Sequence, residues 1–271
     1  MKKQDILTPI GLVLAIGLIL FGAAQGDTEL SIFYDLPSIA ITIGGSFAAV
    51  LITFSSEDLK KIPKMIKMSF ISNNIYKIDL VDQFKEISRK VRKSGVLAIE
   101  DDVAEIEDDF LRKGLELVID GMEVETIKEI LELEILEVES SYNKGSRIFK
   151  VWGSYAPAFG MIGTLIGLIQ MLADMGTPEV IASGMSKALI TTFYGALFAN
   201  VALNPIGFNI QSKGQKETGY REMMLCGIMS IQNGDSTRII EEKLITFLTT
   251  KEKLYYYDRE VEDKGVDTDA A

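Results

Sequence analysis

Four apolar stretches divide the chain, over residues 6–22, 36–54, 151–175 and 180–210. Each is close to the roughly 20 residues that a helix needs to cross a bilayer. Inside a bilayer the backbone must satisfy its own hydrogen bonds, which favours helices in such stretches. The pattern therefore predicts an all-α fold, a polytopic membrane protein with four transmembrane helices and a helical cytoplasmic domain.

Charge is almost absent from these stretches, and only Asp174 and Lys187 bring a charged side chain into them. Both are near the side of the membrane that is predicted to face outward. Ions that cross a membrane usually need an acidic or other polar residue inside the hydrocarbon. If this protein moves ions, a partner must supply the carboxylate.

Basic residues predict the orientation of the chain. The segment 25–35 contains three carboxylates and no basic residue, whereas four lysines follow the second stretch. These are Lys60, Lys61, Lys64 and Lys67. Because cytoplasmic flanks are enriched in basic residues, both termini and the long middle segment are predicted to be cytoplasmic. The protein is expected in the cell's inner membrane as a multi-pass protein, with a short turn at 176–179 outside.

The predicted organisation has four parts. Residues 1–54 carry transmembrane helices 1 and 2, 55–150 a cytoplasmic helical domain, 151–210 transmembrane helices 3 and 4, and 211–271 cytoplasmic C-terminal helices with an acidic tail.

Apolar residues at helical spacing predict the cytoplasmic helices. They predict helices at 79–93, 100–109 and 211–229, and a further helix that begins at a cap by Asp235 or Ser236 and runs to 248. Another helix begins near 123, and because no proline follows before the third span, it is predicted to continue into that span. The tail at 260–271 has no apolar periodicity and is predicted to be disordered.

The segment 60–67 alternates lysines with Ile62, Met65 and Ile66. This pattern is typical of a helix that lies at the anionic inner leaflet. It is equally typical of an ordinary basic flank after a membrane span. Both interpretations stay open.

Composition limits the function. The sequence has no His and a single Cys, Cys226, which argues against zinc sites, Cys–His nucleophiles and a disulfide framework. A net charge of −11 argues against nucleic acid as a partner, because phosphate binding needs a basic surface. We expect a protein that is not an enzyme and that holds no resident metal or cofactor.

A stripe of small or polar residues follows the fourth stretch at every fourth position. Its members are Gly184, Ala188, Thr192, Ala196, Asn200 and Asn204. Small residues let a neighbouring helix approach closely, so packing within one subunit is the plain explanation. Packing alone would be served by Ala, however. The hydroxyls of Thr164, Thr191 and Thr192 are therefore candidates for lining an ion path.

Two prolines lie at similar depth in the last two stretches. Pro157 is near the cytoplasmic start of the third stretch, and Pro205 is near the cytoplasmic end of the fourth. Each proline removes a backbone hydrogen bond, so the pair could form a conformational hinge. Prolines also occur in membrane helices without such a role.

These residues carry a resemblance. The last two stretches resemble the MotA/PomA family of flagellar motor stators, through the runs YAPAFGMIGTLIGLI at 155–169, ALITTFYGALFAN at 188–200, and Asn204-Pro205. The resemblance covers nearly the whole chain. The ExbB and TolQ energisers of the same superfamily typically have one span before their cytoplasmic domain. Four spans thus favour a stator over an ExbB/TolQ-like energiser of an envelope process.

The resemblance implies a partner and an assembly. In the family, five copies form a ring around two copies of a MotB-like subunit, whose membrane helix brings an ion-carrying aspartate. That agrees with the missing carboxylate. The resemblance also implies that Thr164 and Thr192 lie beside the ion path, and that Pro157 and Pro205 support the conformational change coupled to ion flow.

A contact with the rotor protein FliG is implied as well. The run RKSGVLAIE at 92–100 matches the region where the family meets FliG, with Arg92, Lys93 and Glu100 as candidates. Taken from the residues alone, a basic cluster followed by an acidic run most often forms a solvated face with weak surface pairs.

The transported ion is either H⁺ or Na⁺. The hydroxyl of Thr164 can offer an oxygen ligand to Na⁺, which a proton carried by an aspartate does not need. Threonine in a helix also bonds its own backbone. The choice between the two ions stays open.

Overall fold

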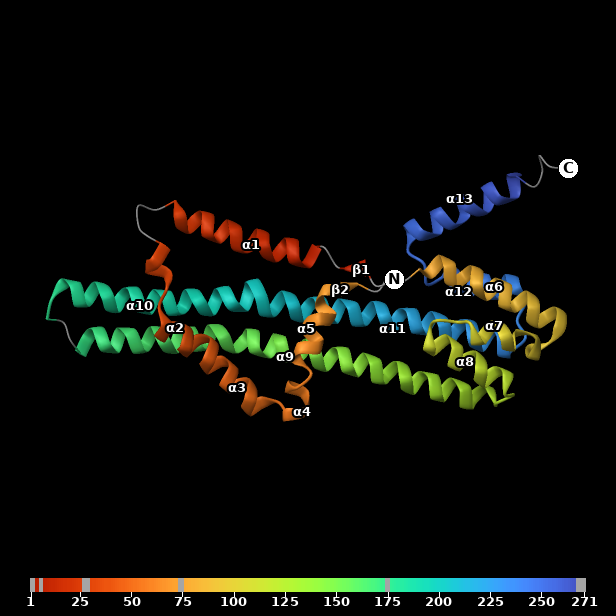
Figure 1. The fold of residues 1–271 in the computed structure, drawn as a ribbon, viewed down its shortest axis with the longest axis horizontal. Helices are drawn as coiled ribbons and strands as arrows, with labels where there is room; N and C mark the ends of the chain where they lie inside the picture. Colours follow the sequence, from red (N-terminus) through yellow and green to blue (C-terminus); the bar gives the residue numbers. More distant parts are fainter. Residues whose placement is uncertain (1–2, 5–6, 26–29, 73–75, 174–175, 267–271) are drawn as a thin grey trace. The chain divides into compact units, whose positions relative to one another are not determined.

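Helices build almost all of this computed structural model, which describes residues 3–4, 7–25, 30–72, 76–173 and 176–266 (Figure 1). Two short strands, β1 (Lys3–Gln4) and β2 (Ile71–Ser72), pair antiparallel. The predicted all-α class is confirmed. Asp174, one of the two charged residues expected in the apolar stretches, lies outside the described residues.

The chain folds into two compact units. The membrane unit consists of Met1–Asn73 and Ser140–Gly214, and the aqueous unit of Asn74–Glu139 and Gln215–Ala271. Two long helices, α9 (Val124–Ala173) and α11 (Asn204–Gln232), contribute to both units. A single helix thus connects the middle segment to the third span, as the absence of a proline predicted.

Several shorter elements complete the membrane unit. They are α1 (Leu7–Ala24), the 3₁₀ turn η1 (Leu30–Phe33), α2 (Leu36–Ile39), the π-helical η2 (Ala40–Gly44), α3 (Gly45–Thr53), α4 (Ser56–Leu59), α5 (Ile62–Phe70), α10 (Pro178–Leu197) and the π-helical η4 (Phe198–Leu203).

Four helical segments within the described residues are long and apolar enough to cross a membrane. They are Leu7–Ala24, Leu30–Thr53 and parts of Val124–Ala173 and Pro178–Gln232. The four predicted spans are confirmed by length and composition. The second and fourth are interrupted by π-helical turns, which apolar composition does not reveal.

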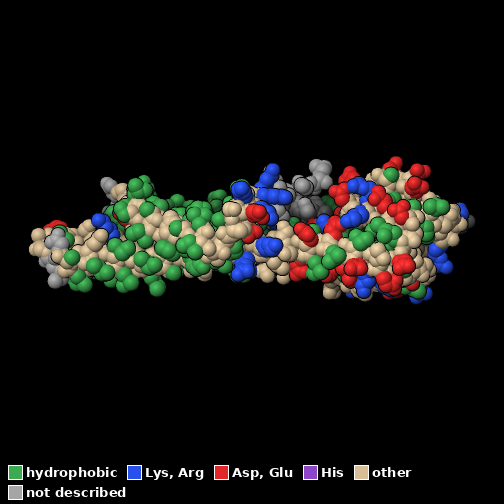
Figure 2. All heavy atoms as spheres, turned by 90° about the horizontal axis from the view of Figure 1, so that it is seen from below, with side chains coloured by type: hydrophobic (Ala, Val, Ile, Leu, Met, Phe, Trp, Pro, Cys, Tyr) green, Lys and Arg blue, Asp and Glu red, His purple; other side chains and the backbone are tan. Residues whose placement is uncertain are grey.

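The first span shows why this unit needs an apolar environment. No residue of α1 is buried, and Leu7, Val13 and Phe21 are 81%, 67% and 64% exposed. Apolar surface on this scale is not stable in water, so it must face lipid or another protein. On the face drawn in Figure 2, hydrophobic side chains spread over the membrane unit, and a group of Lys and Arg side chains lies where this apolar surface ends.

Aromatic and aliphatic side chains form the core of the membrane unit. Trp152 of α9 contacts Phe47 of α3 and Phe198 of η4, with ring centroids 5.2 and 5.3 Å apart. Val50 and Phe149 are buried in the same cluster. These contacts hold the second span against the last two.

The aqueous unit has its own core, made by α6 (Lys77–Ser94), η3 (Val96–Ile99), α7 (Glu100–Ala104), α8 (Asp109–Ile119), α12 (Thr237–Ile245), α13 (Thr250–Val266) and the ends of α9 and α11. Glycines let large side chains interlock there. A Cβ on Gly227 would lie 2.4 Å from Phe84 Cζ, and one on Gly114 would lie 2.4 Å from Ile228 Cδ1.

One carboxylate joins three helices of the aqueous unit. Glu134 on α9 forms ion pairs with Lys113 of α8, at 2.9 Å, and with Arg221 of α11, at 3.1 Å. These pairs hold the ends of the two long helices to α8.

Two expectations for this unit are wrong. The helix predicted at 100–109 is two helices, because the Asp108 carboxylate accepts hydrogen bonds from the amides of Phe110 and Leu111 and so starts α8 anew. The tail predicted to be disordered from Glu260 is helical to Val266, and its remaining part, 267–271, lies outside the described residues. Tertiary contacts of α13, described below, outweigh its acidic composition.

Candidate functional site

Glycines bring α9 and α10 into backbone contact in the membrane unit. A Cβ on Gly195 would lie 2.7 Å from the carbonyl oxygen of Ala156 and 3.1 Å from Pro157 Cα. A Cβ on Gly160 would lie 3.2 Å from the carbonyl oxygen of Thr191. Larger residues would push the helices apart, since backbone atoms cannot move aside. The small residues therefore serve close packing within one subunit.

This close packing places two hydroxyls side by side. Thr164 of α9 and Thr192 of α10 lie within hydrogen-bond distance of each other. Thr164 Oγ1 is also 3.1 Å from the carbonyl oxygen of Gly160 and 3.0 Å from that of Ala188. Thr192 is exposed and Thr164 half-buried. Each hydroxyl has one proton and two lone pairs, so the pair retains oxygen lone pairs that a cation or a protonated carboxyl could use.

Thr191 lies on a different face, so the structure does not bring all three threonines together. Its side chain is buried, its Oγ1 donates to the carbonyl oxygen of Lys187 at 2.7 Å, and it lies 2.9 Å from Ser38 Oγ. A Cβ on Gly163 would meet its methyl group. These contacts are made within one subunit, and a role for Thr191 in an ion path stays a prediction.

The second span contributes a buried polar row that the sequence analysis missed. Ser38, Thr42 and Ser46 are at most 2% exposed. Ser38 meets Thr191, and Ser46 Oγ accepts a hydrogen bond from Trp152 Nε1 at 3.0 Å. The three residues repeat every four positions, as the stripe in the fourth span does. That spacing is the signal that could have identified them.

Measured along α9, the positions of the two prolines differ by about one helical turn. Pro157 is opposite Gly195, whereas Gly153, one turn earlier in α9, is opposite Asn204, the neighbour of Pro205. Pro205 directly follows the start of α11, after the π-helical η4. A wide turn beside a residue without an amide proton leaves the backbone hydrogen bonds weakest there. The hinge role of the two prolines stays a prediction.

In the aqueous unit, the predicted rotor-binding residues surround a sharp turn. Arg92 and Lys93 end α6, Glu100 begins α7, and all three side chains are exposed. Between them Gly95 has φ 83°, a conformation that favours glycine. Nearby, Lys90 pairs with Asp102 at 2.7 Å. The structure thus presents charges of both signs at one corner of this unit.

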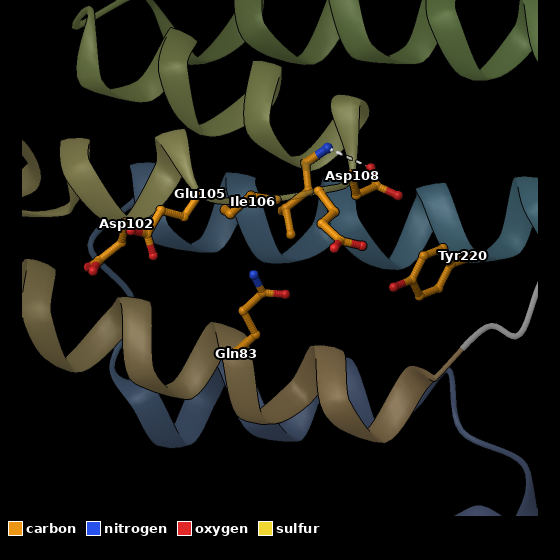
Figure 3. A pocket seen from close by; sticks show the side chains of 8 residues that line it. Gln83, Asp102, Glu105, Ile106, Asp108 and Tyr220 are labelled. Carbon is orange, nitrogen blue, oxygen red and sulfur yellow. Dashed lines mark hydrogen bonds between the residues drawn. The ribbon is translucent and has the colours of Figure 1, made fainter. Parts of the chain in front are cut away.

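An acidic pocket lies beside this corner, between α6, α7, α8 and α11 (Figure 3). Its volume is about 400 Å³. Its lining residues are Gln83, Asp102, Glu105, Ile106, Glu107, Asp108, Leu111 and Tyr220. Burial first, and then the charges of Asp108, Glu217 and Asp79, raise the pKa of Tyr220 to about 12, so its phenol stays a hydrogen-bond donor. Among the described residues, no group of three or more His, Cys, Asp or Glu is arranged to hold a metal ion.

A buried lysine ties α13 to α6. Lys85 is 8% exposed and donates to Tyr256 Oη at 2.8 Å, to Glu241 Oε1 at 3.1 Å and to Glu260. Arg259 of α13 also pairs with Asp82 of α6. The helix that carries Arg92 is therefore held along its side by the C-terminal helix. No local sequence pattern pointed to this cluster.

Comparison with known proteins identifies the family. Residues 102–223 match the model of the MotA/TolQ/ExbB proton channel family. Motility protein A of Borreliella burgdorferi is 38% identical over 250 residues, which cover 92% of this chain and 96% of that protein. The chain belongs to the MotA/PomA family.

Two further matches agree with this membership. YtxD of Bacillus subtilis, an uncharacterised protein, is 41% identical to this MotA-family chain over 254 residues, covering 93% of each. The solved flagellar MotAB stator complex from Bacillus subtilis is 30% identical, with a TM-score of 0.85, over 91% of this chain and 97% of that one. The part matched by the family model contains Thr164, Thr192 and both prolines.

Proposed function

We propose that this MotA-family protein is a flagellar motor stator subunit, which together with a MotB-like partner converts the flow of H⁺ or Na⁺ into torque on the rotor. The observation that carries the proposal is the Thr164–Thr192 pair, two adjacent hydroxyls in the contact between the third and fourth spans, of which that of Thr192 is exposed. An exposed polar group within a membrane span is costly unless it meets a partner, which supports a role toward an ion or a partner helix.

The partner supplies the carboxylate that carries the ion. The sequence has no Asp or Glu at 6–22, 36–54, 151–173 or 180–210. The matched structures are of MotAB complexes, which supports a MotB-like partner for this chain. The aspartate of that partner would pass close to the Thr164–Thr192 pair, whose free lone pairs can accept a hydrogen bond from the protonated carboxyl or bind a sodium ion.

Several copies surround the partner, with five copies around two partner helices as the proposed stoichiometry. No residue of α1 is buried, and a Cβ on its glycines Gly11, Gly17 or Gly22 would meet nothing within 4 Å, so this apolar helix has a face open to other subunits, which supports a closed homo-oligomer. Native mass spectrometry of the purified complex tests this point. A monodisperse monomer would refute the ring.

Orientation and the rotor contact complete the proposal. The lysines at 60–67 support cytoplasmic termini in the inner membrane. With that orientation the aqueous unit is cytoplasmic, and the exposed Arg92, Lys93 and Glu100 form the proposed contact with FliG.

The deciding experiment uses a flagellated bacterium from which the native stator genes are deleted. The chain and its MotB-like partner are expressed together, and swimming speed is measured across a sodium gradient at constant pH and across a pH gradient without sodium. Restored swimming identifies a stator, and the gradient that sets the speed identifies the ion. Non-motile cells that hold the intact complex in their membrane would refute the stator function in favour of an ExbB/TolQ-like energiser.

A further inference from the structure

A group of exposed basic side chains lies on the membrane unit where its apolar surface ends. We call this group the basic belt. Its members are Lys60, Lys61, Lys64, Lys67, Lys144 and Arg147. Lys60 and Lys61 lie in the turn between α4 and α5, Lys64 and Lys67 in α5, and the last two in α9. Figure 2 shows Lys and Arg side chains gathered in this region, beside the hydrophobic surface.

The packing of α5 explains why its lysines point outward. Met65 is 7% exposed and faces α9, where a Cβ on Gly145 would lie 3.1 Å from Met65 Sδ. The carbonyl oxygen of Ser69, another buried residue, accepts a hydrogen bond from Lys213 Nζ at 2.6 Å. One face of α5 is thereby fixed against α9 and α11. Lys64 and Lys67 are left on the opposite, exposed face.

The basic belt has no internal counter-charge. Within the described part of the chain, none of its six members forms an ion pair, whereas lysines of the aqueous unit such as Lys85, Lys113 and Lys243 do. The carboxylates closest in sequence to its four lysines at 60–67 are in α4, and one of them, Asp58, accepts a hydrogen bond from Ser55. The belt therefore presents positive charge to which an anionic ligand can bind.

The surface next to the belt identifies the ligand. Ile52, in the last turn of the second span, is 88% exposed, and Phe208 of α11 is 60% exposed. Lys150 Nζ lies 4.2 Å from the centre of the Phe208 ring, so a cation and an apolar ring meet at the same level. Apolar surface that continues directly into positive charge matches a phospholipid, with acyl chains beside one part and a phosphate beside the other.

We propose that the basic belt binds the headgroups of anionic phospholipids, with α5 lying at the membrane surface as the docking element. The inference goes beyond torque generation and does not depend on it. A water-soluble acidic protein would account for the lysines but not for the adjoining apolar surface, so we favour the lipid.

The test measures lipids retained by the complex of this chain with its partner. The complex is purified in neutral detergent and titrated with phosphatidylglycerol or phosphatidylcholine, and bound lipids are counted by native mass spectrometry at low and high salt. The variant replaces Lys60, Lys61, Lys64 and Lys67 by Gln. A matched control replaces four lysines of the aqueous unit, Lys128, Lys216, Lys251 and Lys253, by Gln.

We expect the wild type and the control to prefer phosphatidylglycerol, and the belt variant to lose that preference. Each lysine near an anionic surface contributes about fivefold in affinity, so the four together should weaken binding at low salt by more than a hundredfold. A second variant with Arg at the four positions keeps the charge and should bind as the wild type does, which separates charge from folding.

Three results would overturn the proposal. The first is a wild-type complex that binds both lipids equally. The second is a belt variant that retains as much phosphatidylglycerol as the control. The third is inorganic phosphate displacing the lipid completely, which would make the belt a site for free anions. Because no result depends on swimming, the lipid site and the stator function can fail separately.

Discussion

Replacing Lys85 by Met should loosen the C-terminal helix from the aqueous unit. Lys85 is the one cation that contacts Glu241, Tyr256 and Glu260 together in the described structure. Burial lowers the pKa of Lys85, but its hydrogen bonds to these three groups outweigh burial and raise the pKa well above its ordinary value. The lysine therefore stays charged, and Met would fill its volume without replacing its hydrogen bonds.

The size of the effect follows from the exposure of the two carboxylates. Removing one partner of a buried ion pair typically costs about 3–5 kcal/mol, because the other charge is left buried. The side chains of Glu241 and Glu260 keep 23% and 24% exposure, so water can solvate them in part. We expect a loss of about 2 kcal/mol in the free energy of opening α13, below the buried-pair range. This corresponds to roughly thirtyfold faster amide exchange in that helix.

Hydrogen exchange read by mass spectrometry measures this directly in the purified full-length complex. Peptides from α13 should exchange faster in the variant, while peptides from α8 should change little. Lys90→Met is the matched control, because Lys90 lies on the same helix and forms an exposed pair with Asp102. That pair is worth about 0–1 kcal/mol. If α13 exchanges equally fast in both variants, the lysine does not hold it, and the apolar contacts of Tyr256 do.

Four further predictions concern the site and its pH dependence. Thr164→Ala should at least halve swimming speed with unchanged yield of the complex, because it removes one hydroxyl of the pair proposed to line the ion path. Unchanged speed would make Thr164 a packing residue. Pro157→Leu should leave assembly intact, as judged by native mass spectrometry, and abolish rotation of tethered cells, whereas normal rotation would count against the hinge. Arg92→Glu combined with Glu100→Lys should impair swimming without lowering thermal stability, since exposed charges contribute only about 0–1 kcal/mol. Charge reversals on FliG should restore part of the swimming speed. Normal swimming of the double variant would show that both residues are ordinary surface residues. Burial alone would raise the pKa of Glu134, but hydrogen bonds from Lys113 and Arg221 outweigh burial and lower it. This carboxylate therefore stabilises the fold above its unfolded pKa of about 4.5, and that stabilisation is lost as the pH falls through the lower folded pKa. The thermal unfolding temperature of Glu134→Gln should accordingly depend less on pH in the acidic range than that of the wild type, and an equal dependence would contradict this role of Glu134.

The spans were predictable because length and apolar composition are local properties. The helical tail was not, since α13 contacts residues that are distant in the sequence, such as Lys85, which is 175 residues away from its partner Glu260. A local pattern carries no information on such a contact. The division between α7 and α8 could have been predicted from the sequence, because Asp108 precedes an apolar run and Asp is a preferred N-cap residue.

The candidate site was predictable in part. Polar residue types in an apolar span pointed to Thr164 and Thr192, and the structure brings the two together. Thr191 and Thr192 are consecutive, however, and consecutive residues on a helix point about 100° apart. Their two hydroxyls could therefore not both bond Thr164, although both residues contact α9. The partner of Thr191, Ser38, belongs to another span, and no spacing within the fourth span could have identified it.

The π-helical η4 has a consequence for how the fourth span could move. On a regular α-helix, Thr192 and Asn204 would point about 120° apart, because twelve residues make three turns and a third. Both nevertheless contact α9, Thr192 at Thr164 and Asn204 at Gly153. The wider π-helical turn between them rotates the following residues back, so that Thr192 and Asn204 both face α9. A translation of α9 along its own axis would therefore shift the Thr164–Thr192 pair and the Gly153–Asn204 contact by the same distance, without rotation of either helix.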